Sequence, residues 1–282
     1  MNPSIGLQLW SVRNSLQQDY RGTLEKVAAI GYQNLELICT VTPQGLVFGK
    51  DWRGPELRRH LDAAGLRAVS CHFVPTPDMS LPAILDDLHA LGVDRLGCAI
   101  AFWNSRAEVK AFCHAFNGYA EVCQKGGVQL YYHNHFEEFQ VFGGQSAYDL
   151  LIEHLDPALV MFEFDTYWAV RGGQDPVYWL KKLGRRCDLL HQKDLPAAAA
   201  PVNLFEKFGY DAALSLDVMW GLQDPVHFTE VGEGVLNIPS YVRAARTYNH
   251  AQYIFVEQDM TSRTELESVA VSFKNLTRIL AG

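Results

Sequence analysis

The sequence predicts one (β/α)₈ barrel of the α/β class over residues 1–282, because short strand-like runs alternate with helical patterns along the whole chain. Eight runs are each followed by a helical segment, and eight parallel strands are the number that closes into a barrel. The chain length also fits the ~250 residues typical of that fold. A doubly wound open sheet is the alternative, but no G-x-G-x-x-G motif follows the first strand. No linker rich in Pro, Gly or Ser divides the chain, so we expect a single domain.

Each predicted strand is a short apolar run, and each predicted helix has apolar residues at helical spacing. The predicted strands span residues 5–9, 34–38, 67–72, 95–100, 128–133, 160–165, 189–192 and 253–257. The predicted helices span residues 22–29, 55–64, 81–91, 106–125, 147–153, 176–183, 240–247 and 265–280.

Proline and glycine mark the ends of several predicted helices. Pro55 and Pro176 lie near a first turn, where the missing N–H is not needed. Gly65 and Gly92 follow a last turn, a position that often takes the left-handed conformation. Residues 195–237 are Ala-rich and loop-like, so the longest connection is expected before the eighth strand.

Composition and charge exclude several kinds of partner. The chain has 24 Lys and Arg against 32 Asp and Glu, a net charge of −8, and no basic run. Nucleic acids and anionic membranes are bound by clustered positive charge, so we expect neither as a partner. No window approaches about 18 uninterrupted apolar residues, and the N-terminus lacks the pattern of a secretory signal. With six cysteines and no C-x-x-C pair, the sequence predicts a cytoplasmic protein with reduced thiols.

Ionisable residues gather at the predicted carboxyl ends of the last four strands, where barrel enzymes carry their active sites. The two-residue period of a strand puts Glu163 and Asp165 on one face and Phe162 and Phe164 on the other. If the phenylalanines face the helices, the ionisable groups of all four strands point into the barrel mouth. These groups are His133 and His135, Glu163 and Asp165, His191 and Lys193, and Glu257.

Four of these residues suggest a metal site, because charged groups rarely fill a core unless they are paired or bound to metal. His133, Asp165, His191 and Glu257 come from four consecutive strands. Two imidazoles and two carboxylates suit Mn²⁺, Zn²⁺ or Co²⁺ better than Ca²⁺. Two alternatives remain open at this point: a hydrogen-bonded polar plug that stabilises the barrel, and acid–base chemistry without a metal.

The chain resembles the xylose isomerase-like TIM barrels, the sugar phosphate isomerase/epimerase superfamily. The resemblance covers nearly the whole chain, and several motifs occur in order at the expected strands. They are GYQNLEL from Gly31, AVSCHF from Ala68, LYYHNHFEEF from Leu130, FEFDTYWAVRGGQDP from Phe162, LLHQKDL from Leu189, VGEGVLNI from Val231 and FVEQD from Phe255.

The resemblance implies a divalent ion, usually Mn²⁺ or a related ion such as Zn²⁺, Co²⁺ or Mg²⁺, held by Glu, Asp, His and Glu of strands five to eight. Asp165, His191 and Glu257 match three of these ligands. The fifth strand departs from the pattern, since His133 stands where many members have Glu. The other residues that could reach the ion from this strand are His135, Glu137 and Glu138.

Four further residues are expected substrate contacts, each with a plainer alternative. Glu36 is expected to bind a substrate hydroxyl or to pair with Lys193, and His72 to contact substrate or to be a hydrogen-bonded barrel histidine. Trp168 is expected to stack on a sugar ring or to pack within its loop. Arg171 is expected to contact an anion or a hydroxyl group.

The main functional prediction is a metal-dependent isomerase or epimerase of a small sugar. The ion would polarise a carbonyl and stabilise the enediolate formed when a base removes the neighbouring proton. Glu257 or His135 is the expected base, with Lys193 assisting at the oxygen. The expected partner is therefore a small carbohydrate, and an assembly of identical chains is left open.

Three alternatives accompany this prediction. The first is a lyase or dehydratase acting on a keto-sugar, keto-inositol or 3-keto-glycoside, which shares the enolate step but then expels a leaving group. His133 beside His135 offers a general acid for that departure. The second is a nuclease resembling endonuclease IV, disfavoured by the acidic charge and by the lack of extra metal ligands. The third is a sugar-binding barrel without catalytic activity.

Overall fold

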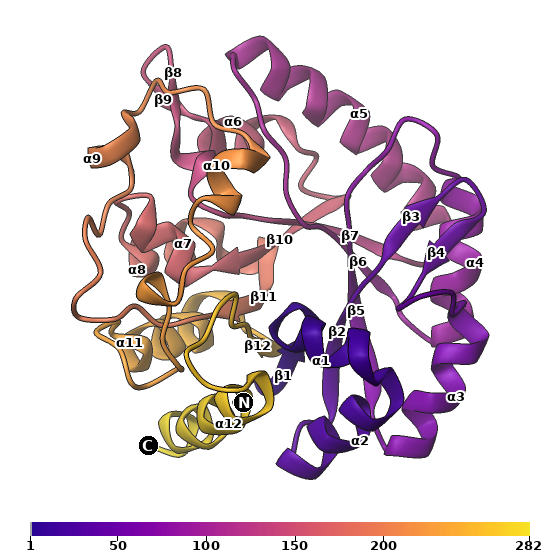
Figure 1. Cartoon of the computed structure of the whole chain (residues 1–282). Coiled ribbons are helices and arrows are strands. Elements are labelled where there is room, and N and C mark those ends of the chain that lie inside the picture. The colour runs from indigo at the N-terminus through magenta and orange to yellow at the C-terminus, as the bar shows by residue number, and fades with distance from the viewer. Residues whose placement is uncertain (1) are drawn as a thin grey trace.

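The computed structural model describes residues 2–282, and its central element is a closed barrel of eight parallel strands. In chain order these are β1 (Ser4–Gln8), β2 (Asn34–Ile38), β5 (Arg67–Phe73), β6 (Arg95–Cys98), β7 (Gln129–His133), β10 (Val160–Asp165), β11 (Cys187–Gln192) and β12 (Tyr253–Val256). The barrel closes where β1 pairs with β12, with Ser4 opposite Tyr253. Figure 1 shows helices surrounding these strands. The predicted α/β barrel is therefore confirmed.

The main helices follow the strands as the sequence predicts, except that α1 was not predicted. They are α1 (Arg13–Gln18) and α2 (Tyr20–Ile30), α3 (Gly54–Ala64), α4 (Leu81–Leu91), α5 (Arg106–Lys125), α6 (Ala147–His154), α8 (Pro176–Leu183), α11 (Ile238–Ala244) and α12 (Glu265–Ala281). Gly65 and Gly92 end α3 and α4 with φ of 70° and 71°, a conformation that costs glycine little. The Thr264 and Glu267 side chains form a capping box at the start of α12.

Several short elements were not expected from the sequence. Two hairpins extend the loops, β3 (Thr40–Thr42) with β4 (Gly45–Val47) and β8 (Val141–Phe142) with β9 (Gln145–Ser146). Helix α7 (Thr166–Arg171) follows β10 without a loop. The long segment before β12, orange in Figure 1, contains α9 (Phe205–Phe208) and α10 (Leu216–Trp220). These elements are too short for a hydrophobic period to reveal them.

The barrel interior is apolar at one level and polar above it. Val69, Tyr131, Leu189 and Phe255 form a separate apolar cluster inside the strands. Gly6 makes room for it, because a Cβ atom there would lie 2.4 Å from the Phe255 ring. In β7 and β11 and at the end of β12, the residues of the same parity further toward the carboxyl ends are His133, His191 and Glu257. The apolar cluster thus closes the barrel beneath the candidate site.

The alternation predicted for β10 is present. Phe162 and Phe164 are fully buried in the core between barrel and helices, while Glu163 and Asp165 point inward and contact groups from other strands. Across residues 2–282 we find no helix with the length and apolarity needed to cross a membrane.

Candidate functional site

Two overlapping groups of buried ionisable side chains lie inside the barrel, and each could hold a metal ion. We call the first the floor cluster; its members are Glu36, His72, Glu163 and His191. We call the second the mouth cluster; its members are His133, Asp165, His191 and Glu257. In each cluster one donor atom per residue lies within 4.8 Å of the others, and His191 belongs to both.

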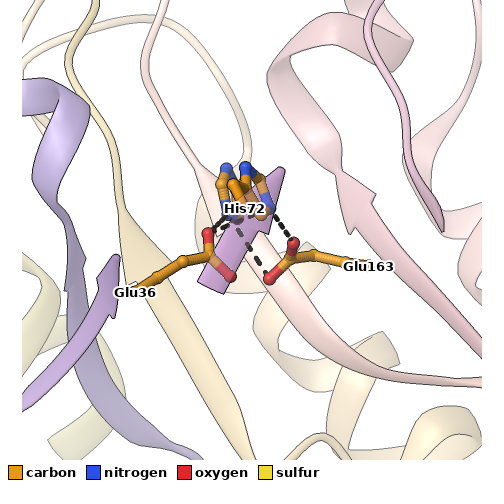
Figure 2. A group of neighbouring side chains, drawn as sticks. Glu36, His72 and Glu163 are labelled. Atoms are coloured by element: carbon orange, nitrogen blue, oxygen red, sulfur yellow. Dashed lines mark hydrogen bonds and ion pairs between the residues drawn. The ribbon is translucent and has the colours of Figure 1, made fainter. Parts of the chain in front are cut away.

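The floor cluster is a closed set of ion pairs. His72 Nε2 lies 2.5 Å from Glu163 Oε2 and 3.2 Å from Glu36 Oε2, and Figure 2 shows its ring between the two carboxylates. His191 Nε2 lies 2.5 Å from Glu36 Oε2. A Cβ atom at Gly97 would lie 2.8 Å from the His72 ring, so glycine on β6 leaves room for this histidine.

Burial and the neighbouring Glu163 raise the pKa of Glu36, whereas His72, His191 and donors on both of its oxygens favour the carboxylate form. Gln8 Nε2 donates to Oε2 at 2.7 Å, and Ser70 Oγ donates to Oε1 at 2.5 Å. His191 Nε2 donates to the same Oε2 atom, so all three neighbours are hydrogen-bond donors to Glu36. Burial alone would lower the pKa of His191, but Glu163, Glu36 and Glu257 outweigh it and raise that pKa well above its usual value. The carboxylates also raise the pKa of His72 against the effect of burial.

These contacts place Glu36 differently from either expectation. Glu36 does not line the cavity and pairs with His191, whereas Lys193 lies over Asp165 and Glu257. His72 pairs with Glu163 and also lines the cavity, so both expectations for it are compatible with the structure.

The mouth cluster is organised around Lys193. Its ammonium group pairs with Asp165 Oδ2 at 2.6 Å and also with Glu257 Oε2. Burial would raise the pKa of Glu257, but Lys193 and His191 hold it well below its usual value, and Lys193 likewise lowers the pKa of Asp165. The second oxygen of Asp165 accepts from the Trp168 backbone N–H at 2.8 Å and so begins α7. Both carboxylates are therefore ionised and fixed in orientation.

His133 presents an unused lone pair to this cluster. Its Nδ1 atom lies 3.3 Å from the Ala99 carbonyl oxygen, to which it donates, so Nε2 is the unprotonated nitrogen. His133 Nε2 is buried, has no hydrogen-bond partner among the described residues, and lies 3.8 Å from Asp165 Oδ2. Burial and then the nearby His191 lower the pKa of His133 to about 4. A neutral imidazole with a free nitrogen is what a metal ligand requires, so these residues fit a divalent ion.

The other candidates of the fifth strand lie outside both clusters. Glu138 accepts from the Tyr132 hydroxyl at 2.6 Å and from the His135 backbone N–H at 2.9 Å. Glu137 is buried beside His135, with 3.7 Å between Oε1 and Nδ1. His135 lines the cavity, and burial followed by the neighbouring His133 and Lys193 lowers its pKa well below its usual value. The structure thus brings His133 to the metal-capable group and leaves His135 facing the cavity as a neutral base.

Trp168 and Arg171 do not line the cavity. Trp168 is buried against the His135 ring, with 5.4 Å between ring centroids, and lies near the Lys193 ammonium. Arg171 is buried near the Tyr167 ring. Both lie on α7, whose first turn Asp165 fixes. Their contact with a substrate remains a prediction.

The cavity above the mouth cluster has a volume of about 650 Å³. Its polar lining includes His72, His133, His135 and Glu257, together with Asp259 from the loop after β12. Sequence reasoning gave no role to Asp259, although it lies two residues beyond Glu257 on the same parity. It also assigned no role to Glu163, because pairing across a barrel depends on strand register.

The chain is similar in sequence and in fold to several known proteins. A sequence model of the xylose isomerase-like TIM barrel family matches residues 24–274. The inosose dehydratase of Geobacillus kaustophilus is 30% identical over 84% of this chain and 79% of the relative. The inosose dehydratase of Mesomycoplasma hyopneumoniae strain 7448 is 26% identical over 55% of this chain. The match spans 49% of that relative, about half of its length. A structure of a sugar phosphate isomerase/epimerase from Parabacteroides distasonis superposes with a TM-score of 0.76 at 26% identity, covering 98% of this chain and 94% of the other.

The prediction that this chain is primarily a sugar isomerase or epimerase is wrong. Both of these relatives are named as dehydratases, which are lyases. Their names therefore favour the lyase or dehydratase, which the sequence analysis gave as the first alternative. The neighbour from P. distasonis carries the name of the wider superfamily, which does not separate the two reactions. Sequence motifs could not separate them either, because both reactions begin with the same proton abstraction and use the same kinds of residue for it.

Proposed function

The chain belongs to the xylose isomerase-like TIM barrel family, and from this we propose that it is a metal-dependent lyase that removes water from a cyclic keto-alcohol. The observation that carries the proposal is the pairing, in one cavity, of a neutral imidazole and a carboxyl group of raised pKa beside a metal-capable cluster. These are His135 and Asp259. The names of the curated relatives support the same reaction class.

We place the divalent ion in the mouth cluster, with His133, Asp165, His191 and Glu257 as the residues that would hold it. His191 would use Nδ1, which lies 2.7 Å from Glu257 Oε2, while its Nε2–H stays on Glu36. Charge supports this choice. The four carboxylates of the two clusters, on Glu36, Glu163, Asp165 and Glu257, carry four negative charges that Lys193, a protonated His72 and one divalent ion would neutralise.

A bound divalent ion supplies Lewis-acid polarisation of the substrate carbonyl, which makes the neighbouring C–H bond acidic. We propose Mn²⁺ as the ion to test first, followed by Zn²⁺, Co²⁺ and Mg²⁺. Lys193 does not line the cavity, so we assign it a positioning role. It keeps Asp165 and Glu257 ionised and oriented through its ion pairs with both.

His135 is our choice of general base. Its side chain lines the cavity, and because Nδ1 is buried 3.7 Å from Glu137 Oε1, Nε2 is the nitrogen that we assign to the substrate. The lowered pKa keeps the ring neutral at physiological pH. It can therefore take the proton from the carbon next to the carbonyl, leaving the electron pair of that C–H bond in the enolate.

Asp259 is our choice of general acid. Burial raises its pKa to about 7, so a large share of the carboxyl group is protonated at neutral pH. It lines the same cavity and can deliver a proton to the hydroxyl group that leaves from the next carbon. The enolate electrons form the new C=C bond as that C–O bond breaks, and the hydroxyl departs as water. Each turnover leaves His135 protonated and Asp259 ionised, and the starting state returns when His135 loses its proton to solvent and Asp259 takes one up.

The experiment that tests the proposal compares wild type with His135→Gln and Asp259→Asn, each loaded with Mn²⁺, on a panel of inososes and cyclic keto-sugars. We expect the wild type to form an unsaturated ketone, detected by its ultraviolet absorbance, and each variant to lose most of that activity while retaining the ion. A wild-type protein that binds Mn²⁺ and dehydrates no member of the panel, tested with and without aryl substituents, would contradict the proposal.

A further inference from the structure

The walls of the cavity are unlike its floor. Apart from Cys39, its ionisable lining residues lie toward the barrel axis and the loop after β12, whereas the walls are apolar except for the Gln223 amide. The wall side chains come from segments far apart in the sequence and include Trp10, Phe73, Val74, Phe102, Met219 and Trp220. A ligand made only of hydroxylated carbons would leave this apolar surface without matching contacts.

Part of the wall is exposed to solvent at the cavity entrance. Trp220 is 50% exposed and Val74 is 47% exposed. The Trp10 and Trp220 rings lie 6.1 Å apart between centroids, so two indoles from opposite ends of the chain form one side of the entrance. Exposed apolar patches next to a polar site commonly mark a surface that a ligand covers. Here the patch is continuous with the catalytic cavity, so the ligand that covers it can be the substrate itself.

Among the described residues that line the cavity, none offers the cationic side chain that a phosphate group would need. Among the described residues no lysine or arginine lines it, and Lys193 lies below the surface with its charge taken by Asp165 and Glu257. The acidic side chains that line the cavity are Glu257 and Asp259, of which Glu257 is held ionised. A phosphate dianion would therefore face like charge without the bidentate or cationic partner that such groups require.

The volume is also larger than one six-membered ring needs. A cavity of about 650 Å³ lies within the ~300–1,000 Å³ range that accommodates drug-sized ligands. The polar floor has room for the reacting ring, and the space between the indoles and the other wall residues remains for a second group. That second group would be flat and apolar, since the side chains around it are aromatic and aliphatic.

We propose that the substrate is an unphosphorylated keto-sugar or keto-cyclitol that carries an aryl group, with the keto ring over the mouth cluster and the aryl group against Trp10 and Trp220. The proposal rests on the proposed function, which places the reacting carbons over the mouth cluster. It goes further by naming what covers the apolar wall. Trp10 and Trp220 act here as residues that set specificity.

The test measures binding without turnover. Isothermal titration calorimetry on Mn²⁺-loaded protein compares phenyl β-D-glucopyranoside, methyl β-D-glucopyranoside and glucose 6-phosphate, none of which has the ketone that the reaction needs. We expect the phenyl glycoside to bind at least about tenfold more tightly than the methyl glycoside, and glucose 6-phosphate to bind most weakly. Equal affinity for the two glycosides, tightest binding of the phosphate, or no binding of the phenyl glycoside overturns the proposal.

Variants of two wall residues test whether the wall causes the preference for the phenyl glycoside. Trp220→Ala and Val74→Ser, both at exposed positions, should reduce the preference for the phenyl over the methyl glycoside to about threefold or less. Tyr178→Ala removes a comparably exposed aromatic ring that is not part of the cavity, so it should leave the preference unchanged. An unchanged preference in both wall variants contradicts the assignment. Dehydration of an unsubstituted inosose without any aryl preference would refute this inference alone, whereas aryl preference without dehydration would refute the proposed function alone.

Discussion

Glu36 holds His191 from across the barrel through a 2.5 Å contact between its Oε2 atom and His191 Nε2. The carboxylate is on β2 and the imidazole is on β11, which are not neighbouring strands. Because Nε2 is occupied, Nδ1 is the nitrogen that faces Glu257. Glu36 therefore selects which nitrogen of His191 can reach a metal ion, as a carboxylate behind a ligand histidine commonly does.

Removing this carboxylate should weaken the metal site from a distance. We expect Glu36→Gln to lower the affinity for Mn²⁺ by about 10–100-fold, the range typical for loss of a group that orients a ligand histidine. Ser70→Ala, which removes only a donor to Glu36, should have a smaller effect in the same direction. Competition with a chelating dye measures both affinities. Equal affinity of Glu36→Gln and wild type would show that the ion does not depend on the contact between Glu36 and His191.

Metal binding at neutral pH should release a proton. The raised pKa of His191 means that the metal-free protein holds this imidazole protonated at pH 7, and a ligand nitrogen must be unprotonated. Affinity should therefore fall as pH is lowered from above neutrality, and calorimetry in two buffers of different ionisation enthalpy should report about one proton released per ion. Release of no proton at pH 7 would contradict this assignment.

Protonation of His133 should weaken metal binding only at acid pH. With a pKa lowered to about 4, it stays neutral above about pH 5 and competes with the ion only below that. The usual titration range of histidine, about 6 to 7, therefore does not apply to it. His133→Ala, which has no group to titrate at this position, should bind Mn²⁺ more weakly and without this contribution to the acid loss. Identical affinity and pH dependence in wild type and His133→Ala between pH 3.5 and 5.5 would remove His133 from the ligand set.

The proposed acid, Asp259, should produce the alkaline limb of the pH profile of kcat/KM, and the proposed base, His135, the acid limb. Asp259 must be protonated to act, so kcat/KM should decline as pH rises through about 7. Asp259→Asn should lose activity by about 10²–10⁴-fold and lose the alkaline limb with it. His154→Gln, which changes a histidine at the end of α6 away from the cavity, is the control for His135→Gln. A wild-type profile that is flat from pH 6 to 8.5 would exclude Asp259 as the acid.

Asp194 should be a structural residue of the site loops. Its carboxylate accepts from the backbone N–H groups of Leu195, Gly232, Gly234 and Leu236 at 2.8–3.1 Å. Asp194→Ala leaves several buried donors without a partner, so we expect a loss of about 2–4 kcal/mol in the free energy of unfolding, measured with urea. Asp194→Asn should lose less. A loss under about 0.5 kcal/mol in Asp194→Ala would show that this loop is held by other contacts.

The fold was predictable because its signals are local. Strand runs, helical spacing and the glycines after α3 and α4 lie within short windows of sequence, and strand parity places Glu163 and Asp165 inside the barrel. The pairing of the site was less predictable. Which nitrogen of His191 faces Glu257, and that Glu36 meets His191 while Lys193 meets Asp165, depend on strand register and on distances across the barrel.

The cavity wall was the least predictable part of the site. Trp10 and Trp220 are 210 positions apart, and the short α10 that carries Trp220 gives no hydrophobic period. The role of Asp259 could not be predicted from the sequence either. Its raised pKa arises from burial and from neighbours that come together only in the folded chain. The choice between lyase and isomerase came from the named relatives, because the shared first step leaves no distinct residue pattern.

The mass of the product formed in deuterium oxide tests the account most directly. Mn²⁺-loaded protein is incubated with an inosose and with an aryl-substituted keto-sugar, and the products are analysed by mass spectrometry. The account predicts a product that has lost one molecule of water, and no such product from Asp165→Asn. A product of the substrate's own composition that has only exchanged its proton next to the carbonyl for deuterium would contradict it.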